Sequence, residues 1–143
     1  MLFRSLMFAA NFELKQEGLS LAGRLLASDG TTVQIRQFAL LTLGRFGGKD
    51  HMPTVEKFLT DTTNCGAYGA ARPQRQLDVQ IRDVALAVLL HITGQSARDY
   101  GAVAVQPSPQ SYFQVPTLAF ANGEARDAAL KRWQEWRAEH SQP

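Results

Sequence analysis

The 143-residue sequence lacks a second cysteine, a strong excess of either charge and an apolar run long enough to cross a bilayer. The single Cys65 excludes an internal disulfide framework. Fifteen basic against thirteen acidic residues leave a net charge of +2, whereas proteins that bind phosphate backbones concentrate basic residues on one face. The composition therefore suits one globular domain and does not argue for a nucleic-acid partner.

The N-terminal stretch MLFRSLMFAANFELK also lacks the basic n-region of a secretory signal peptide, and Arg4 interrupts its apolar part. The sequence leaves the compartment unknown. With no signal peptide and no candidate membrane segment, a cytoplasmic protein without membrane contact is favoured. A chain that begins inside a helical pattern is also compatible with a piece of a larger protein. The sequence leaves the oligomeric state open, and a homo-oligomer is one alternative.

What the sequence does contain is a long apolar segment, DVQIRDVALAVLLHITG, from Asp78 to Gly94. Asp78 is a good N-cap, and no Gly or Pro follows before Gly94. The segment is long for a strand and apolar around most of its circumference. It predicts the most buried helix of the fold, covered on several sides.

Other segments predict further helices with their own start and stop signals. Thr31 and Thr32 offer a cap before one of them, and Asn122 caps the last. Residues 61–77 and 94–119 are rich in turn-forming residues and are predicted as loops. Apolar side chains in and just after the second loop are expected to pack onto the core: Tyr112, Phe113, Val115, Leu118 and Phe120. The expected helices are 2–16, with Leu14 on its packed side and Gly18 as its stop, then Leu19–Ala27, Val33–Phe46, Pro53–Thr60 and Gly123–Glu139.

An internal repeat is the most informative feature. A shift of 46 positions lays Thr32–Gly48 on Asp78–Gly94 with eight identities in seventeen positions, including the pair Gln-x-Arg. Two unrelated amphipathic helices would share three or four. The match indicates a structural duplication.

The stretches Val33-Gln34-Ile35-Arg36-Gln37-Phe38-Ala39 and Val79-Gln80-Ile81-Arg82-Asp83-Val84-Ala85 resemble the second helix of a HEAT or armadillo-type repeat. A period of 46 lies within the range of that class. The resemblance implies an all-α fold, a short right-handed α-α superhelix of stacked helical pairs. We expect one domain over residues 1–143, with units 19–48 and 53–94, a long loop 62–77 and a C-terminal capping region 95–143.

By the same resemblance, Arg36 and Arg82 are expected to bond to acidic or carbonyl groups in the turn of an adjacent repeat. Ligand-facing arginines are the alternative. Because two repeats are fewer than such folds usually need, helices 2–16 and 123–139 are expected to seal the ends. Trp133 and Trp136 are then core residues of the last helix rather than stacking platforms.

No constellation for catalysis stands out. The stretch Gly44–Asp50 differs from a phosphate-binding loop at its first glycine position and at its Ser or Thr position, so it is interpreted as a helix stop. Nothing in the sequence brings a base to Cys65, and the three histidines share no ligand spacing. We expect no enzymatic activity, no cofactor and no metal.

The favoured function is an interaction or scaffold module that binds a protein or peptide partner, with loop 62–77 and the face of the second helices as the contact region. The alternatives are a nucleic-acid-binding protein similar to the HEAT-like DNA glycosylases, with Arg36, Arg45, Arg82 and Asp83 on a concave face, and a structural segment of a larger protein. The candidate partner-binding residues are Arg36, Arg45, Tyr68, Arg72, Arg75 and Arg82.

Overall fold

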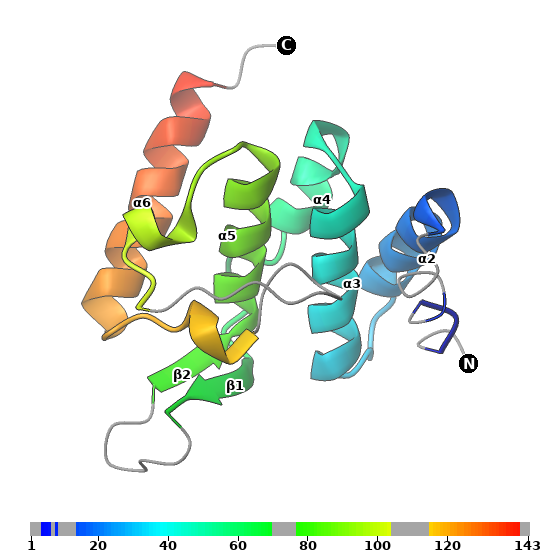
Figure 1. The fold of residues 1–143 in the computed structure, drawn as a ribbon, viewed down its shortest axis with the longest axis horizontal. Helices are drawn as coiled ribbons and strands as arrows, with labels where there is room; N and C mark the ends of the chain where they lie inside the picture. The colour runs from blue at the N-terminus through cyan, green and yellow to red at the C-terminus, as the bar shows by residue number, and fades with distance from the viewer. Residues whose placement is uncertain (1–3, 7, 9–13, 70–76, 104–114, 141–143) are drawn as a thin grey trace.

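The two duplicated segments form helices that lie side by side at the centre of the computed structural model, which describes residues 4–6, 8, 14–69, 77–103 and 115–140 (Figure 1). These helices are α3 (Val33–Phe46) and α5 (Ile81–Ile92). A Cβ added to Gly44 of α3 would lie 3.3 Å from both γ-carbons of Val88 in α5. Gly44 therefore permits a close approach of the two helices, and their predicted contact is confirmed.

Two of the predicted helix starts are also confirmed, because each has a side-chain oxygen that satisfies a free N–H group of the first turn. The hydroxyl of Thr32 accepts a hydrogen bond from the backbone N–H of Ile35 at 3.3 Å. The Asn122 side chain accepts one from Ala125 at 2.8 Å and begins α6 (Gly123–Glu139). In α6, Trp133 is buried, as its helical spacing predicted.

Helix α2 (Lys15–Ala27) begins earlier than predicted and passes through Gly18. The prediction that Gly18 stops a helix is wrong, since its N–H donates to the carbonyl of Leu14 at 2.9 Å and the residue is buried. A glycine inside a helix costs about 1 kcal/mol relative to alanine, a cost that packing of the helix against its neighbours can offset. Most of the predicted helix 2–16 lies outside the described residues.

The helix predicted from Pro53 to Thr60 is shorter. A 3-10 turn (Lys49–His51) leads into α4 (Met52–Glu56), with Pro53 in its first turn. Phe58 and Leu59 then donate to carbonyls three residues earlier. Such bonds tighten the last turn and end the helix.

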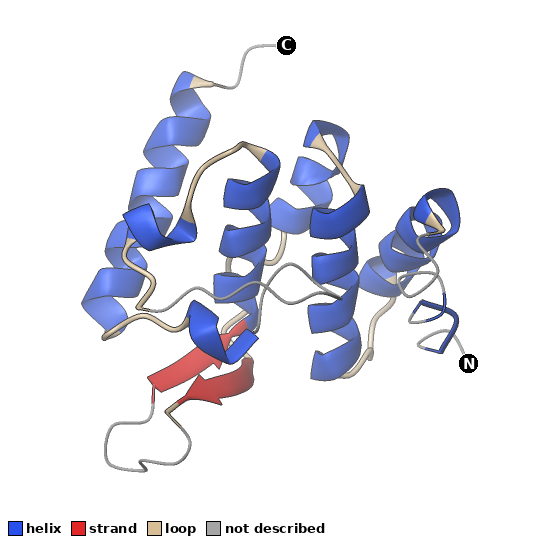
Figure 2. Cartoon of the chain, in the orientation of Figure 1, coloured by secondary structure: helices blue, strands red, loops and turns tan. Residues whose placement is uncertain are grey.

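The main correction concerns the predicted loop, which contains an antiparallel hairpin of strands β1 (Asn64–Tyr68) and β2 (Leu77–Gln80) (Figure 2). Asp78 is a strand residue paired with Ala67, not a helix cap. Helix α5 begins at Ile81 because its first free N–H groups find backbone partners elsewhere. Ile81 donates to the carbonyl of Thr63 and Arg82 to that of Asp61, both at 2.9 Å.

The described residues are thus mostly helical, and they include a small two-stranded sheet. Helix α3 packs against α2 on one side and α5 on the other, while α5 also contacts α4 and α6. The described residues between α5 and α6 include the 3-10 turns Ala97–Tyr100 and η4 (Val115–Leu118). No helix within the described residues is both long and apolar enough to cross a membrane.

Helix α5 is the centre of the core, and all of residues 83–90 are buried. Of the side chains predicted to pack down after α5, Val115, Leu118 and Phe120 are buried, while Tyr112 and Phe113 lie outside the described residues. The face of α5 therefore offers little surface to a partner, contrary to its predicted role as a contact region.

Candidate partner-binding surfaces

The first candidate region is the hairpin end of the two central helices, where Asp61 holds several groups together. Its carboxylate forms an ion pair with Arg36 of α3 and accepts hydrogen bonds from the backbone and hydroxyl of Thr63 at 3.0 and 2.6 Å. Burial acts to raise the pKa of Asp61, but the bonds from Thr63 and the charge of Arg36 outweigh it and hold the pKa below its ordinary value. Arg36 therefore bonds to an acid of the next unit, as predicted.

Arg82 occupies the equivalent position in α5 but does not repeat this contact. Its Nε donates to the side-chain oxygen of Gln80 at 2.6 Å, within its own unit. Of the two contacts expected for these arginines, the structure therefore contains that of Arg36 and not that of Arg82.

A buried ion pair that was not predicted from the sequence links α5 to α6. Asp83 is 3% exposed and Arg126 is 8% exposed. Nε and Nη2 of Arg126 donate to the two carboxylate oxygens of Asp83 at 2.8 and 3.0 Å, and Nη2 also donates to the carbonyl of Asp78. The sequence did contain one indication that Arg126 faces inward. Arg126 lies three and seven residues before Ala129 and Trp133, which places all three on the same face of α6.

Cys65 lies in strand β1 close to both carboxylates. Burial raises the pKa of its thiol to about 12, and the negative charges of Asp83 and Asp61 act in the same direction. The thiol therefore stays protonated near neutral pH, which is unfavourable for a nucleophile or a metal ligand. Within the described part of the chain, no group of three or more His, Cys, Asp or Glu residues is arranged to hold a metal ion.

The remaining predicted partner-binding residues do not gather at one place. Arg45 lies in the last turn of α3, with its guanidinium 5.1 Å from the centroid of the Phe46 ring. Tyr68 pairs with Leu77 in the hairpin. Arg72 and Arg75 lie outside the described residues.

The stretch Gly44–Asp50 ends a helix, as predicted. The N–H of Gly47 donates to the carbonyl of Leu43 at 2.8 Å, and a Cβ at Gly47 would lie 2.4 Å from that oxygen. His51 folds back against this turn and accepts a hydrogen bond from the N–H of Gly48. These close contacts leave no open loop for a phosphate.

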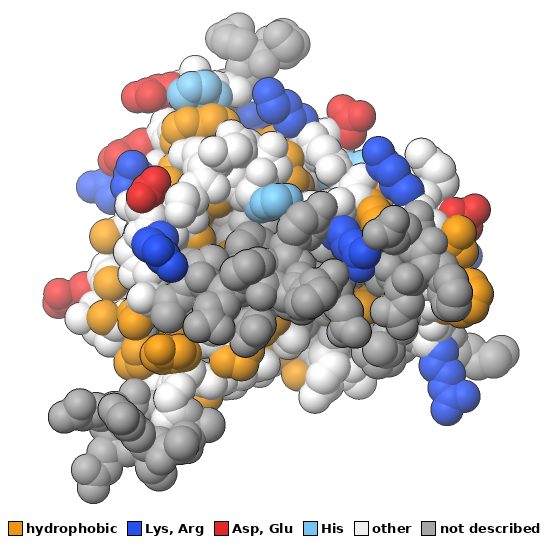
Figure 3. Space-filling model, viewed as in Figure 1, with side chains coloured by type: hydrophobic (Ala, Val, Ile, Leu, Met, Phe, Trp, Pro, Cys, Tyr) orange, Lys and Arg blue, Asp and Glu red, His pale blue; other side chains and the backbone are white. Residues whose placement is uncertain are grey.

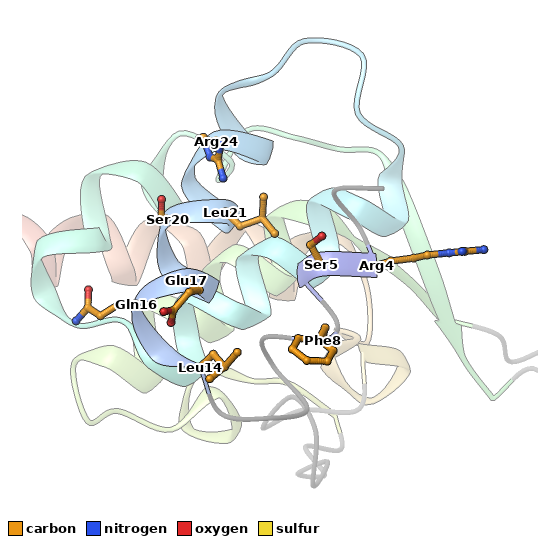
Figure 4. Close-up of a pocket in the computed structure, with 9 residues that line it drawn as sticks. All are labelled: Arg4, Ser5, Phe8, Leu14, Gln16, Glu17, Ser20, Leu21 and Arg24. Carbon is orange, nitrogen blue, oxygen red and sulfur yellow. The ribbon is translucent and has the colours of Figure 1, made fainter.

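The second candidate region is an open groove of about 820 Å³ beside α2 (Figure 4), and it was not predicted from the sequence. Leu21 points from α2 toward the segment that carries Ser5. Two large apolar side chains at the groove are exposed, Phe8 at 56% and Leu14 at 38%. The prediction that Leu14 packs inward is therefore wrong, although Leu6 of the same segment is fully buried.

Charged side chains border this apolar groove on α2. Glu17 lies in the first turn of the helix and Arg24 in the last, and both line the groove. Arg4 lies on the opposite segment, with its side chain directed away from α2 (Figure 4). An apolar surface with a charged border is typical of a site that binds another protein or a peptide.

Comparison with known proteins found no match among protein-family models, among curated proteins or among solved structures.

Proposed function

We propose that this protein is a non-enzymatic interaction module whose α2 groove binds a protein or peptide partner. The observation that carries this proposal is the exposure of Phe8 and Leu14 at the edge of an open groove. Clustered apolar side chains on a surface gain free energy when a partner removes them from water. The groove lies against α2, the first helix that the structure describes in full.

The architecture that we propose for this module is a short HEAT- or armadillo-like stack of helical pairs. In such a stack each pair has an apolar face that only a neighbour covers. The contacts of α3 with α2 and with α5 follow this arrangement. Binding rather than catalysis is favoured by the raised pKa of Cys65 and by the ion pair that occupies both oxygens of Asp83.

The experiment compares capture by the immobilised full chain and by two variants, using an extract of cells that express the protein. Leu14→Glu places a charge at the groove, whereas Val103→Glu alters an exposed large apolar side chain that does not line the groove and is 45% exposed. We expect Leu14→Glu to lose the captured partner and Val103→Glu to retain it. Equal capture by all three proteins would refute the groove as the binding surface.

Nucleic-acid binding has weaker support. On the face shown in Figure 3, the described Lys and Arg side chains are scattered among acidic and apolar ones. Asp83, the acid that such an enzyme would need on a concave face, is buried in its pair with Arg126. Duplex binding across a salt series tests this alternative, because phosphate contacts give a steep loss of affinity with salt.

A further inference from the structure

Exposed residues follow one another along α2, with an acidic residue near its start and a basic residue near its end. Glu17, Ser20 and Arg24 line the groove and are exposed, as is Leu14 before them. The exposed Ala27 follows them at the end of the helix. Glu17 and Arg24 are seven residues apart, which places them on one side of the helix about 10.5 Å from each other. Neither forms an ion pair with any residue that the structure describes.

We propose that the partner of this groove is a second copy of the same chain, bound with the two α2 helices antiparallel about a two-fold axis between Ser20 and Leu21. This rests on the proposed function, in which the groove is an interaction surface. Two-fold dimers are the commonest oligomers, and their interfaces must be self-complementary. The order of residues along α2 meets that condition.

Charge complementarity carries the proposal. The two-fold operation places Glu17 of each copy opposite Arg24 of the other, so two opposite-charge pairs form at once. A parallel arrangement would instead place Glu17 against Glu17 and Arg24 against Arg24, which is repulsive. The charges therefore select the antiparallel orientation.

The uncharged residues agree with the same arrangement. Ser20 is small and exposed and lies beside the axis, where the helices approach most closely. Toward each end, the exposed Leu14 of one copy comes to lie beside Ala27 of the other, so an apolar side chain meets an apolar neighbour. Phe8, at the groove edge, adds apolar surface next to this contact.

The test uses charge reversal in the full chain, with self-association measured by sedimentation over a range of protein concentrations. We expect the wild type to form dimers and Glu17→Arg and Arg24→Glu to dimerise about tenfold more weakly, since each reversal turns two attractive pairs into repulsive ones. An equimolar mixture of the two variants restores both attractive pairs in the heterodimer. We expect it to associate as strongly as the wild type.

Glu124→Arg is the matched control, because it also replaces an exposed acid in the first turn of a helix, α6. Circular dichroism and thermal melting confirm that each variant is folded. A wild type that stays monomeric, or a mixture that associates no better than either variant alone, would overturn the proposal. If Leu14→Glu still loses a different captured protein in that case, the proposed function stands. If Leu14→Glu also captures the same proteins as the wild type, the dimer proposal and the proposed function are both refuted.

Discussion

Helices α3 and α5 carry nearly the same sequence motif, yet each is held to its neighbour by a different ion pair. In α3, Arg36 of the first turn bonds to Asp61, which lies between α4 and β1. In α5, the first-turn residue is Asp83, and it bonds to Arg126 of α6. Each helix forms an ion pair with a residue that follows it in the chain. Helix α3 contributes the arginine of its pair, whereas α5 contributes the aspartate.

The two pairs also differ in their exposure to solvent. The side chains of Arg36 and Asp61 are 24% and 16% exposed, whereas those of Arg126 and Asp83 are 10% and 1% exposed. A charge pair in partial contact with water contributes little to stability, but a buried pair becomes costly when one member is removed. The comparison shows that two copies of a duplicated motif can both form a helix while their ion pairs contribute differently to stability.

The largest effect is expected from breaking the buried pair. Arg126→Met leaves the carboxylate of Asp83 buried without its partner, so we expect the free energy of unfolding to fall by about 3–5 kcal/mol. The equivalent change at the partly exposed pair, Arg36→Met, is expected to cost about 1 kcal/mol. Urea denaturation of both variants measures the difference.

Lys131→Met is the control for the first change, because it replaces an exposed cation on the same helix, α6. We expect it to have little effect on stability. Equal costs for Arg126→Met and Arg36→Met would contradict the comparison between the two pairs.

A smaller difference is expected at the isoleucines that occupy equivalent positions of the repeat. Ile81 of α5 is fully buried, whereas Ile35 of α3 is only partly buried. Ile81→Ala removes buried apolar atoms and leaves a cavity, so we expect a loss of about 3 kcal/mol. Ile35→Ala is expected to cost about half as much. Equal losses of stability for the two variants would contradict the expected difference in burial between Ile81 and Ile35.

The smallest effect is expected from the pH dependence of the Arg36–Asp61 pair. The pKa of Asp61 lies below its ordinary value of 3.8, so the folded state binds a proton on Asp61 less readily than the unfolded state. The resulting stability is present above pH 3.8 and is lost as the pH falls toward the lower folded-state pKa. We expect the advantage of wild type over Arg36→Met to shrink from pH 7 to pH 3. An advantage that stays constant over this range would exclude the ion pair as its source.

Several features of the fold were predictable from the sequence because their causes are local. Thr32 and Asn122 cap helices through side chains that reach N–H groups three residues away. The apolar run of α5 required cover on several sides, and the structure buries it. The repeat of 46 positions predicted a contact between α3 and α5, which the structure contains.

Other features were not predictable because their causes lie far away in the sequence. Asp78 has the chemistry of a helix cap, but pairing with Ala67 makes it a strand residue. The spacing of Arg126 along α6 could indicate an inward position, but its partner could not be predicted because Asp83 lies 43 positions away. The α2 groove likewise depends on where the segment that carries Ser5 and Phe8 lies against the helix.

The sequence by itself determined the periodicity, the duplication and the caps at Thr32 and Asn122, because hydrophobic spacing and short-range hydrogen bonds act within a few residues of one another. Only the tertiary structure decided which charges pair, where the hairpin replaces a loop and which apolar side chains remain exposed. Those outcomes depend on burial and on partners supplied by distant parts of the chain, as the neighbouring residues Arg82 and Asp83 show.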